Sequence, residues 1–364
     1  MEKEEEVKFG RSVIVPSVQE LAKEPITQIP SRYVIRSEND DQLHQSSLSS
    51  IPIIDLHKLL YHHDSTHSEL QKLHIACKEW GFFQIINHGV SNSLLETFKE
   101  EVIKFFELPI EEKKKLWQQP YNHEGFGQLF VVSETQKLDW SDMFYITTLP
   151  LHLRRLHLFN NLPQKIRETL EVYIGAMKKV AQTLLNGMGK ALGIKESEMV
   201  ELFSEGVQSV RMNYYPPCPE PHKAIGFTPH SDADALTILY QLNDTPGLQV
   251  RKHGNWVPIC PLPDALIVNI GDIMEIVSNG IYRSIEHRAT VNSTKERLSV
   301  ATFYSCNLDS ELGPAKSILG PLNPPKFRTE PVEQYFKGFF ARKLDGKSYL
   351  EAMRLHNGVQ AKGS

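Results

Sequence analysis

The pattern of hydrophobic and polar positions divides the chain into a helix-rich first half and a β-rich second half. Between residues 209 and 305, short runs of β-branched and aromatic residues alternate with turn residues, which is typical of strands. Within this region, His253-Gly254-Asn255 has the composition of a hairpin turn. The expected strands are 210–215, 236–241, 248–251, 257–259, 266–270, 274–277, 282–291 and 298–305. About eight strands at this spacing predict a double-sheet jelly roll.

The longest helical pattern lies immediately before the β-rich region. Pro163 begins it and Gly193 ends it, which gives about 30 residues, or roughly 45 Å at 1.5 Å per residue. Its apolar positions recur at spacings of three and four and form one stripe of Ile166, Leu170, Tyr173, Met177, Val180, Leu184 and Met188. A helix with this apolar face is suited to cover one side of a sheet, and we interpret its methionines as core residues.

Shorter elements are expected on both sides of these two patterns. Apolar positions at helical spacing predict helices over 70–80 and 94–105, and β-prone runs predict strands at 51–54 and 82–87. The glycine-flanked stretch 125–130 fits either a loop or a strand that overhangs an active site. A proline-rich segment at 313–325 precedes two short helices, 334–340 and 348–353.

These patterns together predict an α+β fold. Its core is a double-stranded β-helix (jelly-roll, cupin-like), backed by the long helix and flanked by N- and C-terminal helices. We expect an N-terminal extension at 1–50, a helix and strand region at 51–200, the jelly-roll core at 201–310 and a C-terminal tail with short helices at 311–364. No internal repeat is visible, and we expect the regions to form one structural unit.

Composition and charge narrow the possible functions. Of the 364 residues, 40% are hydrophobic and 23% charged, and the net charge is −4, which is ordinary for a soluble enzyme. The basic cluster Lys113-Lys114-Lys115 follows two glutamates and indicates a solvated helix face, so we expect no nucleic-acid partner. The four cysteines show no C-x-x-C spacing, the N-terminus is acidic, and no run of 18 apolar residues occurs. We therefore expect a cytoplasmic protein without a membrane span, and nothing requires more than a monomer.

A possible metal site begins with His230 and Asp232. Residues i and i+2 of an extended segment project from the same face, so an imidazole and a carboxylate can reach one ion. His287, in a later strand-like run, offers a third ligand, whereas Glu286 alternates to the opposite face. Two histidines and one carboxylate with open coordination positions are the ligand set of non-haem Fe(II) oxygenases. Because the chain has 15 histidines, an H-x-D triplet can occur by chance. The residues around it must therefore show whether it binds a metal.

Arg297 and Ser299 follow His287 in another β-prone run. Arginine pairs with carboxylates through its forked guanidinium, and a nearby hydroxyl can take another lone pair. A metal beside such a pair suits a dicarboxylate that chelates the metal at one end and is anchored at the other.

The combined motifs resemble those of the plant 2-oxoglutarate/Fe(II)-dependent dioxygenases. Four of them stand in the family's order: N-Y-Y-P-P-C-P from Asn213, H-x-D from His230, E-H-R-A from Glu286 and R-x-S from Arg297. The resemblance extends to I-P-I-I-D from Ile51 and covers roughly residues 15 to 355. Within the family the chain looks closest to the branch of alkaloid O-demethylases and norcoclaurine-synthase-like and senescence-related proteins.

This resemblance implies the cofactors and the roles of single residues. Fe(II) would be held by His230, Asp232 and His287, and the co-substrate 2-oxoglutarate by Arg297, Ser299, Tyr215 and Asn213, with ascorbate as the reductant. Phe303 matches a family position that stacks on aromatic substrates. Phe126 and Phe130 are further substrate-binding candidates, for which a place in the ordinary core is the alternative. Asp234 stands where many relatives carry glycine, near the expected metal entrance.

The expected function is the oxidative decarboxylation of 2-oxoglutarate coupled to hydroxylation or oxidative O-demethylation of a small plant specialised metabolite. The expected partners are 2-oxoglutarate, O2 and an alkaloid, flavonoid or other aromatic or polycyclic substrate. One alternative is a hormone-inactivating dioxygenase. Another is a jelly-roll binding or condensing protein without redox turnover, which would not need Arg297 and Ser299 beside an intact metal site.

Overall fold

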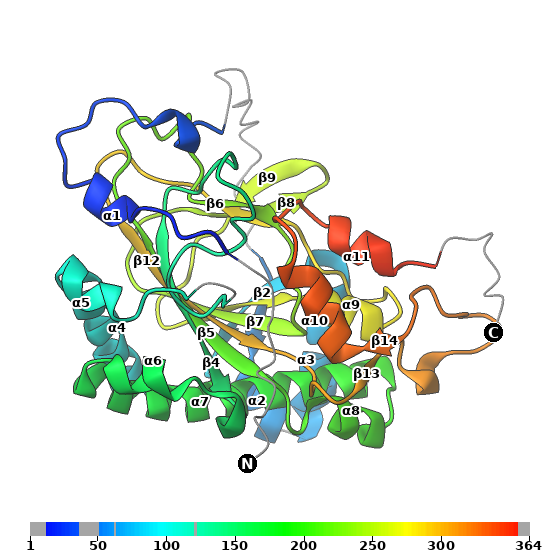
Figure 1. Ribbon diagram of the computed structural model, residues 1–364. Coiled ribbons are helices and arrows are strands. Elements are labelled where there is room, and N and C mark those ends of the chain that lie inside the picture. The colour runs from blue at the N-terminus through cyan, green and yellow to red at the C-terminus, as the bar shows by residue number, and fades with distance from the viewer. Residues whose placement is uncertain (1–11, 36–50, 62, 120–121, 356–364) are drawn as a thin grey trace, which may run out of the picture.

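Two mainly antiparallel sheets that face each other form the centre of the molecule (Figure 1), and the one parallel pair in them, within the described residues, is β1 with β2. The computed structural model describes residues 12–35, 51–61, 63–119 and 122–355. The large sheet has eight strands, in the order β1 (Ile53–Asp55), β2 (Phe82–Ile86), β10 (Leu266–Ile270), β7 (Leu236–Gln241), β12 (Arg297–Tyr304), β5 (Gln208–Tyr215), β4 (Asp142–Leu149) and β3 (Gly125–Gly127). The small sheet has four, in the order β6 (Phe227–His230), β11 (His287–Ala289), β8 (Leu248–Lys252) and β9 (Asn255–Pro258). The predicted jelly-roll core with flanking helices is confirmed.

The alternation of side chains along β5 and β12 assigns a different role to each face of the large sheet. The two strands pair in antiparallel register, with Arg297 opposite Tyr215 and Ser299 opposite Asn213. One face therefore carries the polar residues of the R-x-S and N-Y-Y motifs, because residues two apart share a face. The other face carries apolar residues of the main core, among them Val210, Met212, Leu298 and Val300.

Helices cover the apolar face. The long helix α7 (Gln164–Leu192) runs along it (Figure 1), and all seven residues of the predicted stripe are buried. The hydroxyl groups of Tyr173 on α7 and Thr302 on β12 lie 3.2 Å apart, which ties the helix to the sheet. Gly193 ends α7 in the left-handed conformation with φ 72°, where glycine has no steric penalty. The other helices of the N-terminal half are α1 (Val18–Leu21), α2 (Leu56–Tyr61), α3 (His63–Ile75), α4 (Asn92–Glu107), α5 (Ile110–Lys114), α6 (Leu156–Asn161) and α8 (Glu196–Phe203).

The C-terminal segment crosses to the small sheet and approaches the predicted metal site. It contains α10 (Val332–Phe340) and α11 (Ser348–Met353), as predicted, and the short strands β13 (Glu311–Leu312) and β14 (Glu330–Pro331). Between the helices, Gly346 exchanges backbone hydrogen bonds of 3.2 Å with Pro229 and Ser231, the neighbours of His230. The buried carboxylate of Glu275 accepts hydrogen bonds from Lys347 and Arg354 at 2.8 and 2.6 Å. This segment is therefore fixed over one end of the sheet pair.

Two expectations about local structure were wrong, and the strand β4 was missed. The run 274–277 is not a strand but part of helix α9 (Asp272–Val277), because Gly271 begins a helix and a short apolar run fits a buried helix equally well. Of the expected strand 282–291, only His287–Ala289 pairs with neighbours. The strand β4 was not predicted at all, although it lies between β5 and the edge strand β3 in the large sheet.

The stretch 125–130 combines both structures proposed for it. Gly125–Gly127 forms the edge strand β3, and the chain leaves the sheet before Phe130, which has a positive φ of 64°. Within the predicted N-terminal extension, residues 1–11 and 36–50 lie outside the described part of the chain.

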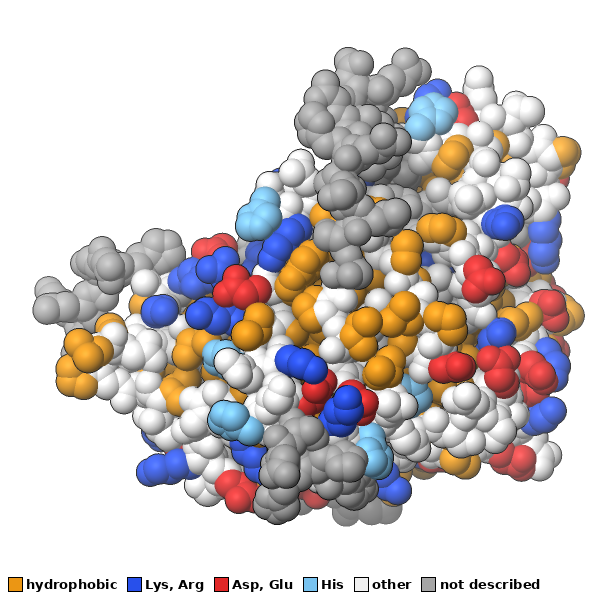
Figure 2. Space-filling view, turned by 180° about the vertical axis from the view of Figure 1, so that it is seen from behind, with side chains coloured by type: hydrophobic (Ala, Val, Ile, Leu, Met, Phe, Trp, Pro, Cys, Tyr) orange, Lys and Arg blue, Asp and Glu red, His pale blue; other side chains and the backbone are white. Residues whose placement is uncertain are grey.

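The surface carries mixed charge. On the face seen in Figure 2, Lys and Arg side chains lie among Asp and Glu side chains and form no continuous basic stripe. Of the helices in the described ranges, none combines the length and the hydropathy needed to cross a bilayer.

Candidate active site

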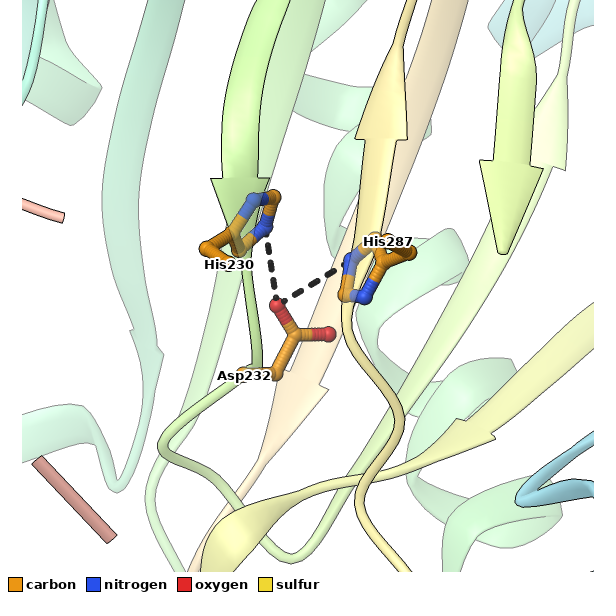
Figure 3. Close-up of side chains that lie close together, drawn as sticks. All are labelled: His230, Asp232 and His287. Atoms are coloured by element: carbon orange, nitrogen blue, oxygen red, sulfur yellow. Dashed lines mark ion pairs between the residues drawn. The ribbon is translucent and has the colours of Figure 1, made fainter. Parts of the chain in front are cut away.

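His230 and Asp232 meet the distant His287 at the end of the small sheet. His230 is the last residue of β6 and His287 the first of β11, and the two lie directly opposite each other in antiparallel register. Asp232 follows β6 by two residues, and its Oδ1 lies 3.4 Å from Nε2 of His230 and 3.6 Å from Nε2 of His287. Both rings point toward this carboxylate (Figure 3), and the three potential ligand atoms lie within 4.8 Å of one another.

Backbone carbonyl groups fix the orientation of both imidazole rings. Nδ1 of His230 lies 2.7 Å from the carbonyl oxygen of Thr228, and Nδ1 of His287 lies 3.1 Å from that of Ile285. Since a carbonyl oxygen only accepts, each Nδ1 carries the proton and each Nε2 presents a lone pair to the centre of the cluster. This is the usual arrangement around metal-binding histidines.

The two oxygens of Asp232 have different surroundings. Oδ2 accepts hydrogen bonds from the Thr237 hydroxyl at 2.5 Å and the Asn269 amide at 2.7 Å. Oδ1 faces the two imidazoles and remains available as a ligand atom. The carboxylate is thereby oriented by two buried partners that the sequence analysis did not identify.

The electrostatics of the cluster suit a divalent cation. Burial alone raises the pKa of Asp232, but the neighbouring His287 and His230 rings outweigh burial and hold that pKa well below its ordinary value. Burial lowers the pKa of His287 to about 4, although the Asp232 carboxylate opposes the shift. The cluster therefore combines a carboxylate with a neutral imidazole at neutral pH, which are the protonation states that metal binding requires.

The predicted clamp for a dicarboxylate lies on the facing sheet. Arg297 is 3% exposed; its Nη2 donates to Gln241 at 3.0 Å and its Nη1 to Ser299 at 3.3 Å. Its Nε is buried without a hydrogen-bond partner among the described residues, so one donor of the fork is still available. The guanidinium lies 5.2 Å from the ring of Tyr215, and Asn213 lies on the same strand face.

Gly247 leaves the space that Arg297 occupies. A Cβ atom at this glycine would stand 2.6 Å from Cδ of Arg297, closer than real Cβ contacts. The residues present therefore fit a ligand with two carboxylates, one reaching the metal cluster and the other Arg297.

Three cavities lie at or near the cluster. A small cavity of about 50 Å³ is lined by the metal cluster and by Arg297, Ser299, Tyr215 and Asn213. A second of about 40 Å³ shares His230 and Asp232 with it and is lined also by Phe130 and Phe303. An outer cavity of about 800 Å³ shares Tyr145, Asp234 and Phe340 with the second. Each cavity is therefore adjacent to the next, and the second and outer cavities offer room for a substrate beside the cluster.

The three candidate substrate residues differ in position. Phe303 and Phe130 line the second cavity, whereas Phe126 is fully buried between Phe105 and Phe106 in the main core and lines none of the three cavities. Phe126 is therefore a residue of the hydrophobic core, which was the alternative interpretation, and we do not propose it as a substrate-binding residue. Its place follows from the strand β3, in which Phe126 faces the core helices.

The sequence analysis identified only part of the cavity lining. The helix α10 and the segment after it contribute Phe339, Phe340 and Leu344, which lie more than 100 residues from the metal motif. Asp234 lines the second and outer cavities, as its place near the entrance had suggested. Arg211 lines the first two cavities, and its signal was available: it stands two residues before Asn213 and therefore on the same strand face.

The chain matches two family models and several known proteins over most of its length. The model of the 2OG-Fe(II) oxygenase superfamily matches residues 206–305, and that of the N-terminal region of the non-haem dioxygenases in morphine synthesis matches residues 51–165. The chain is 51% identical to oxoglutarate-dependent flavonoid 7-O-demethylase 1 of Ocimum basilicum, over 96% of this chain and 93% of that protein. It is 50% identical to codeine O-demethylase of Papaver somniferum, over 96% and 98%.

A solved structure has a similar fold over nearly the whole chain. The crystal structure of JOX2 in complex with 2OG, Fe and JA superposes with a TM-score of 0.84 at 36% identity. The match covers 94% of this chain and 98% of that one.

Proposed function

The chain belongs to the 2OG-Fe(II) oxygenase superfamily and is a 2-oxoglutarate-dependent dioxygenase, and from this premise we propose that it oxidatively O-demethylates a small methoxylated aromatic or polycyclic plant metabolite. The observation that carries the proposal is the identity of about half of all positions, over nearly the whole chain, to two proteins named as O-demethylases. The cavity beside the metal cluster, lined by Phe130, Phe303 and Phe340, supports an aromatic substrate.

We assign the binding of the two cofactors to the two facing sheets. His230, Asp232 and His287 hold Fe(II) from the small sheet and the segment after it. Arg297, Ser299, Tyr215 and Asn213 hold 2-oxoglutarate from the large sheet. When bound, Fe(II) and 2-oxoglutarate together activate O2 and supply the oxidising chemistry, with release of succinate and CO2.

The side chains of the protein orient the reactants and exclude water. The carbonyl groups of Thr228 and Ile285 keep the two imidazoles in their ligating tautomer, and Thr237 and Asn269 keep one oxygen of Asp232 directed at the metal. The aromatic lining holds the methyl ether of the substrate next to the metal and keeps bulk water out.

The proposed reaction balances as follows. One atom of O2 enters succinate and the other enters the methyl carbon of the substrate. The hydroxymethyl ether so formed is a hemiacetal, which releases formaldehyde and leaves a phenol or alcohol. Hydroxylation of a carbon that is not bound to oxygen uses the same residues and stops at the hydroxylated product.

The two alternative functions have less support. The relatives named for jasmonate are 35–36% identical to this chain, below the 49–51% of the named O-demethylases. A binding or condensing protein without redox turnover has no need of an ordered metal cluster facing a buried arginine with a free donor. We also infer a cytoplasmic monomer that uses ascorbate as reductant and binds neither nucleic acid nor membrane; the four unpaired cysteines support a reducing compartment.

The test is a product assay with the purified protein, Fe(II), ascorbate and 2-oxoglutarate, offered methoxylated flavonoids and methoxylated alkaloids. Succinate and formaldehyde in equal amounts, absent from His230→Ala, are the expected result. Succinate with a product heavier by one oxygen atom would assign hydroxylation instead. Absence of 2-oxoglutarate turnover in the wild type with every substrate would contradict the proposal.

A further inference from the structure

The second cavity and the outer cavity meet at three side chains, which we call the neck. Tyr145 on β4, Asp234 after β6 and Phe340 at the end of α10 line both cavities, and every other lining residue belongs to one cavity or the other. A substrate that extends from the metal cluster into the outer cavity therefore contacts one carboxyl group and two aromatic rings on its way.

The carboxyl group of Asp234 has no counter-charge. Within the described ranges its only hydrogen-bond donor is its own backbone N–H, and the charged side chains that act on it, Asp232 and Asp272, are both acidic. Burial, followed by the charges of these two neighbours, raises the pKa of Asp234 to about 8. A cation in contact with the carboxyl group would favour its charged form instead.

The arginines that line the two cavities do not supply this cation. Arg154 pairs with Glu171 at 2.9 Å, and Arg155 pairs with Glu124 at 3.2 Å. Arg211 packs 4.0 Å over an aromatic ring of the small sheet. In the part of the chain that the structure describes, none of the three acts as a charge partner of the neck carboxyl group.

The aromatic rings of the neck are fixed by contacts of their own. The hydroxyl of Tyr145 donates to Oγ of Ser209 at 2.9 Å, so the ring and not the hydroxyl is left for a ligand. The ring of Phe340 stacks on His123, with 4.4 Å between the centroids and 21° between the planes. Aromatic faces attract ammonium groups, and recognition of quaternary ammonium ligands by several rings is a recurrent use of this attraction.

We propose that Asp234, Tyr145 and Phe340 form a subsite for a positively charged nitrogen, so that the preferred methoxylated substrates carry a protonated or quaternary amine. This inference rests on the proposed function and narrows the substrate class of the same site. The Cα atoms of Asp232 and Asp234 are at most about 7 Å apart, so a molecule with one aromatic ring can reach from the metal cluster to the neck. Asp234 is thus a specificity-determining residue.

An effect of Asp234 on the metal alone makes different predictions. Asp234 stands two residues after the ligand Asp232, and a second negative charge there would raise the affinity for any divalent cation. In that case loss of the charge would weaken Mn(II) binding and would affect charged and uncharged substrates alike.

Binding measurements without turnover separate these roles. The full-length protein, loaded with Mn(II) and 2-oxoglutarate without O2, is titrated with four probes that share a para-methoxyphenethyl group. The probes end in a trimethylammonium, a dimethylamino, a tert-butyl or a carboxylate group, and the tert-butyl group has the shape of trimethylammonium without its charge. Binding is followed by the Mn(II)-induced relaxation of the methoxy protons, which also reports their proximity to the metal.

Two variants test the carboxyl group. Asp234→Asn keeps its shape and removes the charge, whereas Asp234→Glu keeps the charge. The matched control is Asp309→Asn, because Asp309 is an exposed residue that lines none of the three cavities.

The wild type and Asp309→Asn should bind the trimethylammonium probe about ten- to a hundredfold more tightly than the tert-butyl probe. The dimethylamino probe should behave like the trimethylammonium probe, and the carboxylate probe should bind most weakly. Asp234→Asn should lose most of this preference, and Asp234→Glu should keep part of it. The affinities for Mn(II) and 2-oxoglutarate should change little in both variants.

Three results would overturn the inference. These are equal affinities of the wild type for the trimethylammonium and tert-butyl probes, an unchanged preference in Asp234→Asn, and a loss of Mn(II) affinity as large as the loss for the trimethylammonium probe. The first result needs no variant, so it decides the matter even where Asp234→Asn does not fold.

Failure of the proposed function is visible separately, because this assay needs no reaction. A preference for the cationic probes without formaldehyde release would contradict only the reaction. Formaldehyde release without a preference for the cationic probes would contradict only the role of Asp234.

Discussion

The two oxygens of Asp232 illustrate how single side chains prepare the metal site. Oδ2 is held by Thr237 and Asn269, and only Oδ1 faces the imidazoles. A carboxylate fixed in this way loses little conformational freedom when it binds an ion. The groups behind the ligands therefore contribute to metal affinity although they do not touch the metal.

Replacement of Thr237 tests this contribution. Thr237→Val keeps the shape of the side chain and removes the hydroxyl that donates to Asp232 Oδ2 at 2.5 Å. The dissociation constant for Mn(II), measured by calorimetry, should rise about 10- to 100-fold. Thr302→Val is the matched control, because Thr302 is equally buried but lies on the opposite face of the large sheet. Equal affinities in Thr237→Val and wild type would show that Thr237 does not order the carboxylate.

The buried imidazole of His287 makes a prediction about pH. Its pKa is lowered to about 4, mainly by burial, whereas an unperturbed histidine has a pKa of about 6.5. A lowered pKa means that the ring stays neutral, and able to bind metal, as the pH falls through 6.5. The ring protons of His287, followed by NMR in the metal-free protein, should therefore titrate only below about pH 5, and protonation of this ligand should weaken Mn(II) binding only in that range. A titration of the His287 ring between pH 6 and 7 would contradict its neutral state.

At the scale of the elements, the sequence determined the strands and helices that have a regular pattern. The stripe of α7, the hairpin at His253-Gly254 and the strands β7 and β10 follow directly from periodicity and turn residues. The prediction of a strand at 274–277, where the structure has helix α9, was wrong because six residues that are all buried show no hydrophobic periodicity. Likewise, the metal ligands have a local signal in H-x-D, but the cavity residues of α10 reach the site only through tertiary packing.

The C-terminal segment allows a test at this scale. Glu275, 3% exposed, holds it through Lys347 and Arg354 and also accepts a hydrogen bond from the backbone N–H of Ser284 at 2.8 Å. Glu275→Ala leaves these donors without their acceptor, and we expect a loss of roughly 2–3 kcal/mol in the free energy of unfolding by urea.

Hydrogen exchange of the same variant should localise the effect. Residues 341–347 should exchange faster, and substrate-coupled succinate formation should fall, because this segment carries Leu344 beside the metal cluster. The control is Glu333→Ala on α10, whose partner Lys337 is at the surface, with an expected change below about 0.5 kcal/mol. Equal exchange of 341–347 in wild type and Glu275→Ala would exclude this anchoring role.

At the scale of the whole molecule, the active site lies between two facing sheets whose strands alternate along residues 208–304. The small sheet supplies the histidines, and the large sheet supplies Arg297 and Ser299. Ligands that bind both sheets at once should therefore stabilise the folded protein as a unit. By mass action, each ligand present at 100 times its dissociation constant adds about 2.7 kcal/mol to the free energy of unfolding.

Thermal unfolding tests how the metal site and the 2-oxoglutarate site depend on each other. The protein is heated with Mn(II), with 2-oxoglutarate, and with the two ligands together. Wild type should show a rise in Tm of a few degrees with Mn(II) and a further rise when 2-oxoglutarate is added. Arg297→Met should keep the Mn(II) effect and lose most of the second rise, since its guanidinium holds the far carboxylate. His230→Ala should lose both, because the co-substrate needs the metal to complete its binding. Stabilisation of His230→Ala by 2-oxoglutarate alone, to the same extent as wild type with Mn(II), would place the co-substrate away from the metal cluster.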